Sequence, residues 1–204
     1  MMVKSANPTT KSWKIAVIAG LIGSAIVLHI FKIPYPPATF LKFDLCGIPL
    51  MVSAFIALIE TTVLGLPVFY LGIFALGGAM DPIGPSMKVL AELSTFLPVV
   101  AMYRRVKPST AGLRSLLPLV AIAAVSRVSV MCLINLAVTP YWLQIMGWVK
   151  SWEQAWSFTI FILPHIAVFN TVAAVYVALL SIPLIRIVKA MGVTLVGEKE
   201  GARS

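Results

Sequence analysis

Apolar runs long enough to cross a lipid bilayer, separated by short polar or proline-rich connections, constrain this chain more than any other feature. The runs cover approximately residues 13–31, 48–64, 66–80, 86–103, 113–138 and 157–187. A helix rises about 1.5 Å per residue, and the hydrocarbon layer is roughly 30 Å thick. We therefore predict an all-α integral membrane protein with a six-transmembrane-helix bundle. The third run spans only about 22 Å, so we expect a short third helix.

Composition agrees with a membrane protein. Apolar residues make up 60% of the chain and charged residues 11%, whereas soluble domains carry roughly 25% charged residues. The mean hydropathy is +0.99. The net charge of +9 does not indicate nucleic-acid binding, because the basic residues punctuate apolar runs and form no basic face.

The basic residues predict the topology. Most of the 16 Lys and Arg residues fall on the side that holds both termini, and the positive-inside rule places that side in the cytoplasm. The first run ends at Lys32 and a proline-rich turn without a cleavage site, so we expect it to be retained. We predict one multi-pass domain of the cell membrane, with residues 13–190 as the bundle and residues 1–12 and 191–204 as cytoplasmic tails.

The sequence contains no recognisable catalytic or metal-binding motif. There is no H-E-x-x-H, no G-x-S-x-G and no phosphate-binding P-loop. Cys46 and Cys132 have neither metal-ligand spacing nor a disulfide pattern, so we expect two unpaired thiols. We predict no enzymatic activity, no metal site and no cofactor in this chain. Uphill transport would then take its energy from an ion gradient or from partner subunits.

The connection from Phe40 to Pro49 is the most informative loop. It follows the first apolar run, lies outside in the predicted topology, and holds Lys42, Phe43 and Asp44. Loops on a rigid scaffold often carry binding residues. We predict that this loop covers a small-molecule site, with Phe40, Lys42, Phe43 and Asp44 as substrate-binding residues.

Lys88, Glu92 and Arg127 are candidate site residues in the fourth and fifth runs, where charge is costly unless it is paired or faces a cavity. Lys88 and Glu92 are four positions apart, so they share a helix face and can pair. Arg127 lies near the middle of its run and needs a partner. Glu92 is one candidate and an acidic group of a ligand is the other.

Two amides complete the predicted substrate site. Asn135 lies eight positions after Arg127, about 80° round the helix, so both can line one cavity. Asn170 lies near the middle of the last run and is preferred to His165, which we interpret as a structural hydrogen-bonding residue. We therefore add Lys88, Glu92, Arg127, Asn135 and Asn170 to the predicted substrate-binding residues.

Small residues recur on the first apolar run. Ala16, Gly20 and Ser24 are spaced four apart, a pattern that lets another helix approach closely. The partner helix can belong to this chain or to another subunit, and the spacing alone does not choose between them.

Residues 139–156 are rich in aromatic side chains, including Trp142, Trp148, Trp152 and Trp156. Amphipathic aromatic residues favour the headgroup region of a bilayer. We interpret this stretch as an interfacial belt or helix, although some of its rings can also roof a site.

These features together resemble the substrate-binding S component of energy-coupling-factor (ECF) vitamin transporters. The resemblance lies in the six short spans, the small residues of the first run, Leu41-Lys42-Phe43-Asp44 followed by Ile48-Pro49, and Gly84-Pro85 before the fourth span. It is closest to the riboflavin-type branch. The sequence departs from that branch at Gly47, where the family usually has a second acid, and at Gly20, where it more often has alanine.

The resemblance implies a site open to the outside, covered by the first loop and lined by the fourth to sixth helices. It implies that Ala16 and Gly20 meet a transmembrane coupling subunit driven by two ATPase subunits, which use the ATP. Riboflavin is the favoured ligand, and pantothenate or another vitamin is the alternative. The rivals are a structural membrane protein without a solute and an intramembrane enzyme acting on lipid.

Overall fold

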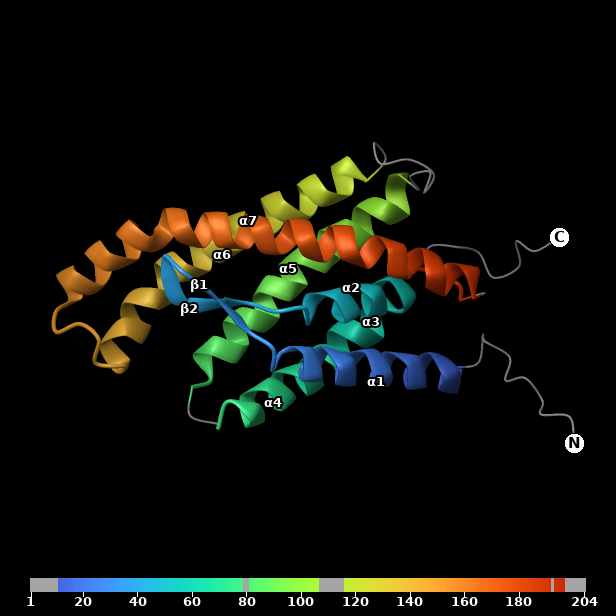
Figure 1. The fold of residues 1–204 in the computed structure, drawn as a ribbon, viewed down its shortest axis with the longest axis horizontal. Helices are drawn as coiled ribbons and strands as arrows, with labels where there is room; N and C mark the ends of the chain where they lie inside the picture. The colour runs from blue at the N-terminus through green and yellow to red at the C-terminus, as the bar shows by residue number, and fades with distance from the viewer. Residues whose placement is uncertain (1–10, 79–80, 107–115, 192, 197–204) are drawn as a thin grey trace, which may run out of the picture.

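The polypeptide runs back and forth along one long axis (Figure 1). The computed structural model describes residues 11–78, 81–106, 116–191 and 193–196. Its helices are α1 (Lys11–Leu28), α2 (Gly47–Ile56), α3 (Leu58–Glu60), the π-helix η1 (Thr61–Gly65), α4 (Leu66–Leu76), α5 (Ile83–Val106), α6 (Leu117–Ile145) and α7 (Trp152–Ala190). The start of α1 and the end of α7 lie at the same end of the molecule, here called the terminal end (Figure 1).

Within the described residues, four helical segments are long and apolar enough to cross a membrane. They are Leu58–Leu76, Ile83–Arg105, Leu117–Ile145 and Trp152–Ala190, the first of which joins α3, η1 and α4. The chain is therefore a multi-pass membrane protein. The helices α1 and α2 are apolar but shorter.

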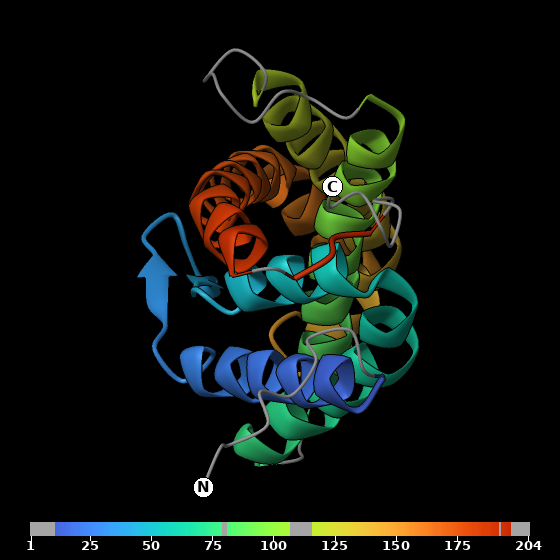
Figure 2. The ribbon, with the colours of Figure 1, turned by 90° about the vertical axis from the view of Figure 1, so that its right-hand side faces the viewer.

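The short helix is the second, which corrects the prediction that the third would be short. Helix α2 has 10 residues, a rise of only about 15 Å. All of its residues are buried, and it lies between α1 and α7 when the molecule is viewed along its long axis (Figure 2). Neighbouring helices rather than lipid therefore surround α2.

The second and third segments separate at Ala57, where neither glycine nor proline marks the break. Ala57 has φ −154° and ψ 90°, which ends the helical ladder of α2. The freed Phe55 carbonyl accepts a hydrogen bond from the Val196 amide at 2.8 Å. The carbonyl freed by the break is thus hydrogen-bonded by a residue near the far end of the sequence. No local sequence pattern predicts this break.

The predicted break at Gly65, between the second and third apolar runs, does not occur, although Pro67 follows it closely. Proline lacks an N–H and clashes with the carbonyl four residues earlier in a regular helix. Here the Leu66 amide donates to the Thr61 carbonyl, five residues back, which widens the helix into the π-helical turn η1. The wider turn precedes Pro67, so the helix passes the proline without ending.

The last two helices extend beyond their predicted ends. Helix α6 continues past Pro140 to Ile145, and α7 begins at Trp152. The Ser151 hydroxyl caps α7 by accepting a hydrogen bond from the Gln154 amide at 3.2 Å. The aromatic stretch is therefore divided between the two helices and a short turn.

The first connection contains a β-hairpin, so the fold is mostly helical but not all-α. Strands β1 (Ile33–Tyr35) and β2 (Ala38–Phe43) pair antiparallel, with Ile33 opposite Phe43. The prolines of this stretch favoured a turn in the sequence. Proline is tolerated in strands that have a free edge, as both strands of an isolated hairpin do. The hairpin lies in the half of the molecule away from the terminal end, here called the hairpin end (Figure 1).

Helix α1 packs on α4 through glycines. A Cβ on Gly72 would lie 2.6 Å from Cδ1 of Ile26, and a Cβ on Gly65 would lie 2.9 Å from Cδ1 of Ile22. The opposite face of α1 is exposed and carries the small-residue stripe Ala16, Gly20 and Ser24. A Cβ on Gly20 would meet no heavy atom within 4 Å. The stripe therefore does not pack against the described part of this chain.

These two glycine environments predict opposite effects of the same substitution. Each Gly→Ala change adds about 1 kcal/mol of helix propensity, but only Gly72→Ala forces Ile26 to move, which costs roughly 1–3 kcal/mol. We expect Gly72→Ala to lower the thermal unfolding midpoint of the detergent-solubilised protein and Gly20→Ala to keep or raise it. Equal midpoints for the two variants would contradict the close packing of α1 on α4.

Candidate functional site

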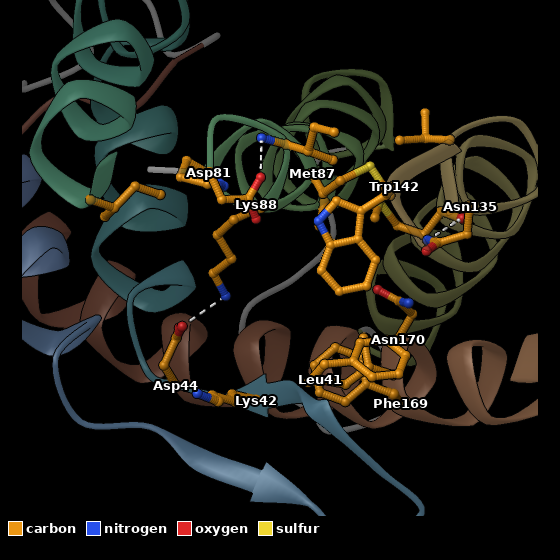
Figure 3. Close-up of a pocket in the computed structure, with 18 of the residues that line it drawn as sticks. Leu41, Lys42, Asp44, Asp81, Met87, Lys88, Asn135, Trp142, Phe169 and Asn170 are labelled. Carbon is orange, nitrogen blue, oxygen red and sulfur yellow. Dashed lines mark hydrogen bonds and ion pairs between the residues drawn. The ribbon is translucent and has the colours of Figure 1, made fainter. Parts of the chain in front are cut away.

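A cavity of about 400 Å³ lies between the hairpin and helices α4 to α7. Most of the predicted substrate-binding residues line it, namely Phe40, Lys42, Asp44, Lys88, Arg127, Asn135 and Asn170. Phe43 and Glu92 do not line the cavity but contact residues that do. The fold thus brings into one cavity residues that the sequence separates by more than a hundred positions (Figure 3).

Asp44 joins the hairpin to the helices. Its Oδ1 lies 2.9 Å from Nζ of Lys88 and accepts a hydrogen bond from the Cys46 amide at 3.1 Å. Its Oδ2 lies 2.9 Å from Nδ1 of His29. The Tyr176 hydroxyl donates to its backbone carbonyl. These contacts fix the point where β2 turns into α2.

Burial by itself raises the pKa of the Asp44 carboxyl. The Lys88 ammonium lowers this pKa, and the hydrogen bonds from His29 and the Cys46 amide lower it further. The pKa of Asp44 therefore lies well below its usual range. Asp44 is therefore an anion at neutral pH, and its charge holds Lys88.

Lys88, Glu92 and Arg127 form a buried ionic series. Lys88 Nζ lies 2.9 Å from Glu92 Oε1, and Arg127 Nη1 lies 3.2 Å from the same oxygen. Both predicted pairings of Glu92 are therefore confirmed as contacts. The ligand acid that was the alternative partner for Arg127 is not needed to neutralise it.

Arg127 also connects α6 to α7. Its Nε donates to Asn170 Oδ1 at 3.0 Å, and its Nη1 donates to Thr95 Oγ1 at 3.0 Å. Asn170 in turn donates from Nδ2 to the Ile166 carbonyl at 2.8 Å. The Arg127 side chain is only 2% exposed, so these contacts set its position and the shape of the cavity wall.

Asn135 lies on the same cavity wall. It donates from Nδ2 to the Met131 carbonyl at 2.7 Å, and its Oδ1 accepts a hydrogen bond from the Thr139 hydroxyl at 3.0 Å. These contacts within α6 fix the orientation of the amide at the cavity surface.

Gly47 explains how Glu92 fits beneath the hairpin. A Cβ at this position would lie 2.3 Å from Glu92 Oε2 and 2.9 Å from a methyl carbon of Val177. A larger residue at 47 would therefore displace the Glu92 carboxylate. The acid that the family pattern places at this position is absent here, and the carboxylate of Glu92 occupies the adjacent space.

Aromatic rings lie between the hairpin and helices α6 and α7. Phe43 stacks on Phe169 with ring centroids 4.5 Å apart. Phe40 contacts Trp142 and Trp148 with centroids 6.0 Å and 6.3 Å away. The hairpin therefore contacts both α6 and α7 through its aromatic side chains.

Several lining residues were not predicted: His29, Lys32, Leu41, Asp81, Met87, Trp142 and Phe169. His29 directly follows the end of α1, and its bond to Asp44 depends on how the loop folds back. Trp142 had been grouped with the interfacial aromatics. Tyr141, Trp148, Trp152 and Trp156 of that group are indeed exposed.

The two cysteines are unpaired, as predicted. Cys46 nevertheless lies near His29 and Asp44, with one ligand atom of each within 4.8 Å of the others. The sequence spacing gave no indication of this group. Lys88 already places a positive charge 2.9 Å from Asp44, so a cation here would be repelled, and we assign no metal to it.

The described structure is similar to a solved structure of the S component of a bacterial ECF transporter. The TM-score is 0.66 at 21% sequence identity, and the match covers 89% of this chain and 98% of that chain. No protein-family model and no curated protein sequence matches the chain. The chain therefore has the fold of an S component, as the resemblance of its sequence implied.

The Asp44 contacts predict a pH-dependent effect of Asp44→Asn. Removing one partner of a buried ion pair costs about 3 kcal/mol, so the variant should unfold at a lower temperature in detergent at neutral pH. The pKa of Asp44 is lowered in the folded protein, so the Asp44 carboxylate stabilises the fold above about pH 4. This stabilisation is lost as the pH falls through the pKa that Asp44 has in the folded protein. The difference between wild type and variant should therefore narrow only below about pH 4.

Glu153→Gln is the matched control, because Glu153 is an exposed acid at the start of α7. The unfolding temperature of Glu153→Gln should stay close to that of the wild type at every pH measured. A difference between wild type and Asp44→Asn that is unchanged under acidic conditions would contradict the paired state of Asp44.

Proposed function

We propose that this protein is the substrate-binding S component of an ECF-type vitamin transporter in the cell membrane. The observation that carries the proposal is a polar and aromatic cavity beneath a hairpin, in a chain with the S-component fold. Ligand sites are typically cavities of roughly 300–1,000 Å³ with apolar walls and a few placed polar groups. The cavity here has that size and composition.

In this proposal six segments cross the membrane as one domain, with α2 shielded by its neighbours. Alternate segments run in opposite directions along the long axis, and the described ends of α1 and α7 lie together (Figure 1). The excess of Lys and Arg on that side places both termini in the cytoplasm by the positive-inside rule. The hairpin end, with its cavity, then faces outward.

Riboflavin is the ligand we favour. A flavin ring needs flat apolar surfaces and a few amide or hydroxyl partners, and Phe40, Phe169, Asn135 and Asn170 line the cavity. Another vitamin such as pantothenate is the alternative. A carboxylate ligand is less well supported, because Lys88 and Arg127 are already paired with carboxylates.

The exposed stripe of α1 supports a docking role. Ala16, Gly20 and Ser24 face away from the rest of the described chain, and a close helix–helix contact uses such small residues. In the proposal this face meets the transmembrane coupling subunit. Two ATPase subunits supply the energy, so this chain needs no cofactor and performs no catalytic step.

The transport cycle we propose begins with capture of the vitamin from outside and closure of the hairpin over it. Docking through α1 then reorients the bundle and releases the vitamin inside. Binding and closure determine selectivity, and ATP hydrolysis by the partner subunits determines direction. A purely structural membrane protein is the rival, in which the buried polar residues only hold the helices together.

Ligand binding distinguishes the proposal from that rival. We expect purified protein to carry flavin absorbance or to bind added riboflavin, measured by quenching of flavin fluorescence. High-affinity binding of a colourless vitamin without flavin binding would keep the S-component role and exclude riboflavin. Binding of no vitamin at all would favour the structural role.

Docking predicts a separation of uptake from binding. In the Gly20→Leu variant a bulky side chain would block close helix approach, so vitamin uptake by cells that express the coupling and ATPase subunits should fall at least tenfold, as for a coupling loss of about 1.4 kcal/mol. Vitamin binding by the purified variant should be unchanged. Ala121→Leu, at an exposed position of α6, is the control and should retain uptake. Equal uptake by both variants would contradict docking through α1.

A further inference from the structure

The four charged groups of the ionic series, Asp44, Lys88, Glu92 and Arg127, satisfy one another, whereas Lys32 and Lys42 line the cavity as exposed side chains. Lys88 lies between Asp44 and Glu92, with 2.9 Å to an oxygen of each. Arg127 contacts Glu92, Thr95 and Asn170. Within this series two carboxylates and two cations therefore balance. A ligand carboxylate could reach either cation only by displacing a buried protein carboxylate and leaving it unpaired, which is strongly unfavourable.

The amides of the cavity are also engaged by the protein. Asn135 and Asn170 each donate to a carbonyl four residues earlier in their own helix. Asn135 Oδ1 accepts from Thr139 and Asn170 Oδ1 accepts from Arg127. These contacts orient the amides before any ligand arrives.

Trp142 is different, because its indole nitrogen is buried and has no hydrogen-bond partner among the described residues. The ring lines the cavity and is held by Phe40 and Trp148, with centroids 6.0 Å and 4.9 Å away. In Figure 3 its nitrogen-bearing edge faces the side of the cavity on which Lys88 lies. A buried donor without a partner is unfavourable, so it marks a place where a ligand acceptor would be bound.

We propose that Trp142 is a specificity-determining residue that donates a hydrogen bond from Nε1 to an uncharged acceptor of the bound molecule. This inference rests on the proposed function. The acceptor is a carbonyl oxygen or a ring nitrogen, and the substrate class is an uncharged heteroaromatic compound. Its flat ring fits beside the indole and Phe169, which also lines the cavity. Such a compound can bind without displacing a carboxylate from Lys88 or Arg127.

The test compares Trp142→Phe with Trp156→Phe in the detergent-solubilised full-length protein. Both changes remove an indole N–H and keep an aromatic ring, but Trp156 is 42% exposed and does not line the cavity. Riboflavin is the uncharged heteroaromatic probe, and pantothenate is the anionic probe without an aromatic ring. We expect Trp142→Phe to bind riboflavin roughly tenfold more weakly, as for the loss of one hydrogen bond to a buried acceptor. Trp156→Phe should bind like the wild type.

Thermal unfolding of the ligand-free variants provides a second measurement. Trp142→Phe should unfold at about the same temperature as Trp156→Phe, because the N–H it loses makes no hydrogen bond in the ligand-free protein. Saturating riboflavin should then raise the unfolding temperature of Trp156→Phe more than that of Trp142→Phe, since stabilisation by a ligand follows its affinity.

The outcomes separate the inference from the proposed function. Equal riboflavin affinity of the wild type and Trp142→Phe would overturn the inference and leave the S-component role in place. Binding of pantothenate without riboflavin would overturn the uncharged-acceptor assignment and also leave that role. Binding of neither probe would overturn the inference together with the ligands proposed above.

Discussion

The Lys88 ammonium lies between two buried carboxylates, and the packing of the hairpin on the helices depends on this pair of contacts. Through Asp44 it holds the end of the hairpin, and through Glu92 it leads to Arg127 on α6. Arg127 then bonds Asn170 on α7. Loss of any one charged member would leave the buried charges of the series unbalanced, which is unfavourable. A continuous series of polar contacts therefore fixes one loop and three helices around a cavity.

The part of this series that could be predicted from the sequence is its local part. Lys88 and Glu92 are one helical turn apart, and charges are so scarce in the spans that Glu92 was the natural partner for Arg127. The contacts of Asp44 with Lys88 and His29 could not be predicted, because they depend on how the loop folds back over the helices. The orientation of Trp142 into the cavity depends on the same folding, and composition alone grouped it with its exposed neighbours.

The helical bundle followed from the apolar runs, whereas several element boundaries did not. At Ala57 the chain breaks without glycine or proline, because the free Phe55 carbonyl is bonded by Val196 from the far end of the chain. At Gly65 the expected break is absent, because the π-helical turn η1 accommodates Pro67. The hairpin was hidden by its prolines, which an isolated pair of strands tolerates. In each case a contact or backbone adjustment outside the local pattern decided the structure.

Helix α1 links the two surfaces to which the proposal assigns function. Its exposed face carries the small-residue stripe Ala16, Gly20 and Ser24. Its hydrogen-bond ladder continues to His29, whose amide donates to the Ala25 carbonyl at 3.0 Å and whose ring contacts Asp44. The small-residue stripe and the His29 contact with Asp44, the residue that joins the hairpin to the cavity, are therefore carried by one continuous run of backbone hydrogen bonds.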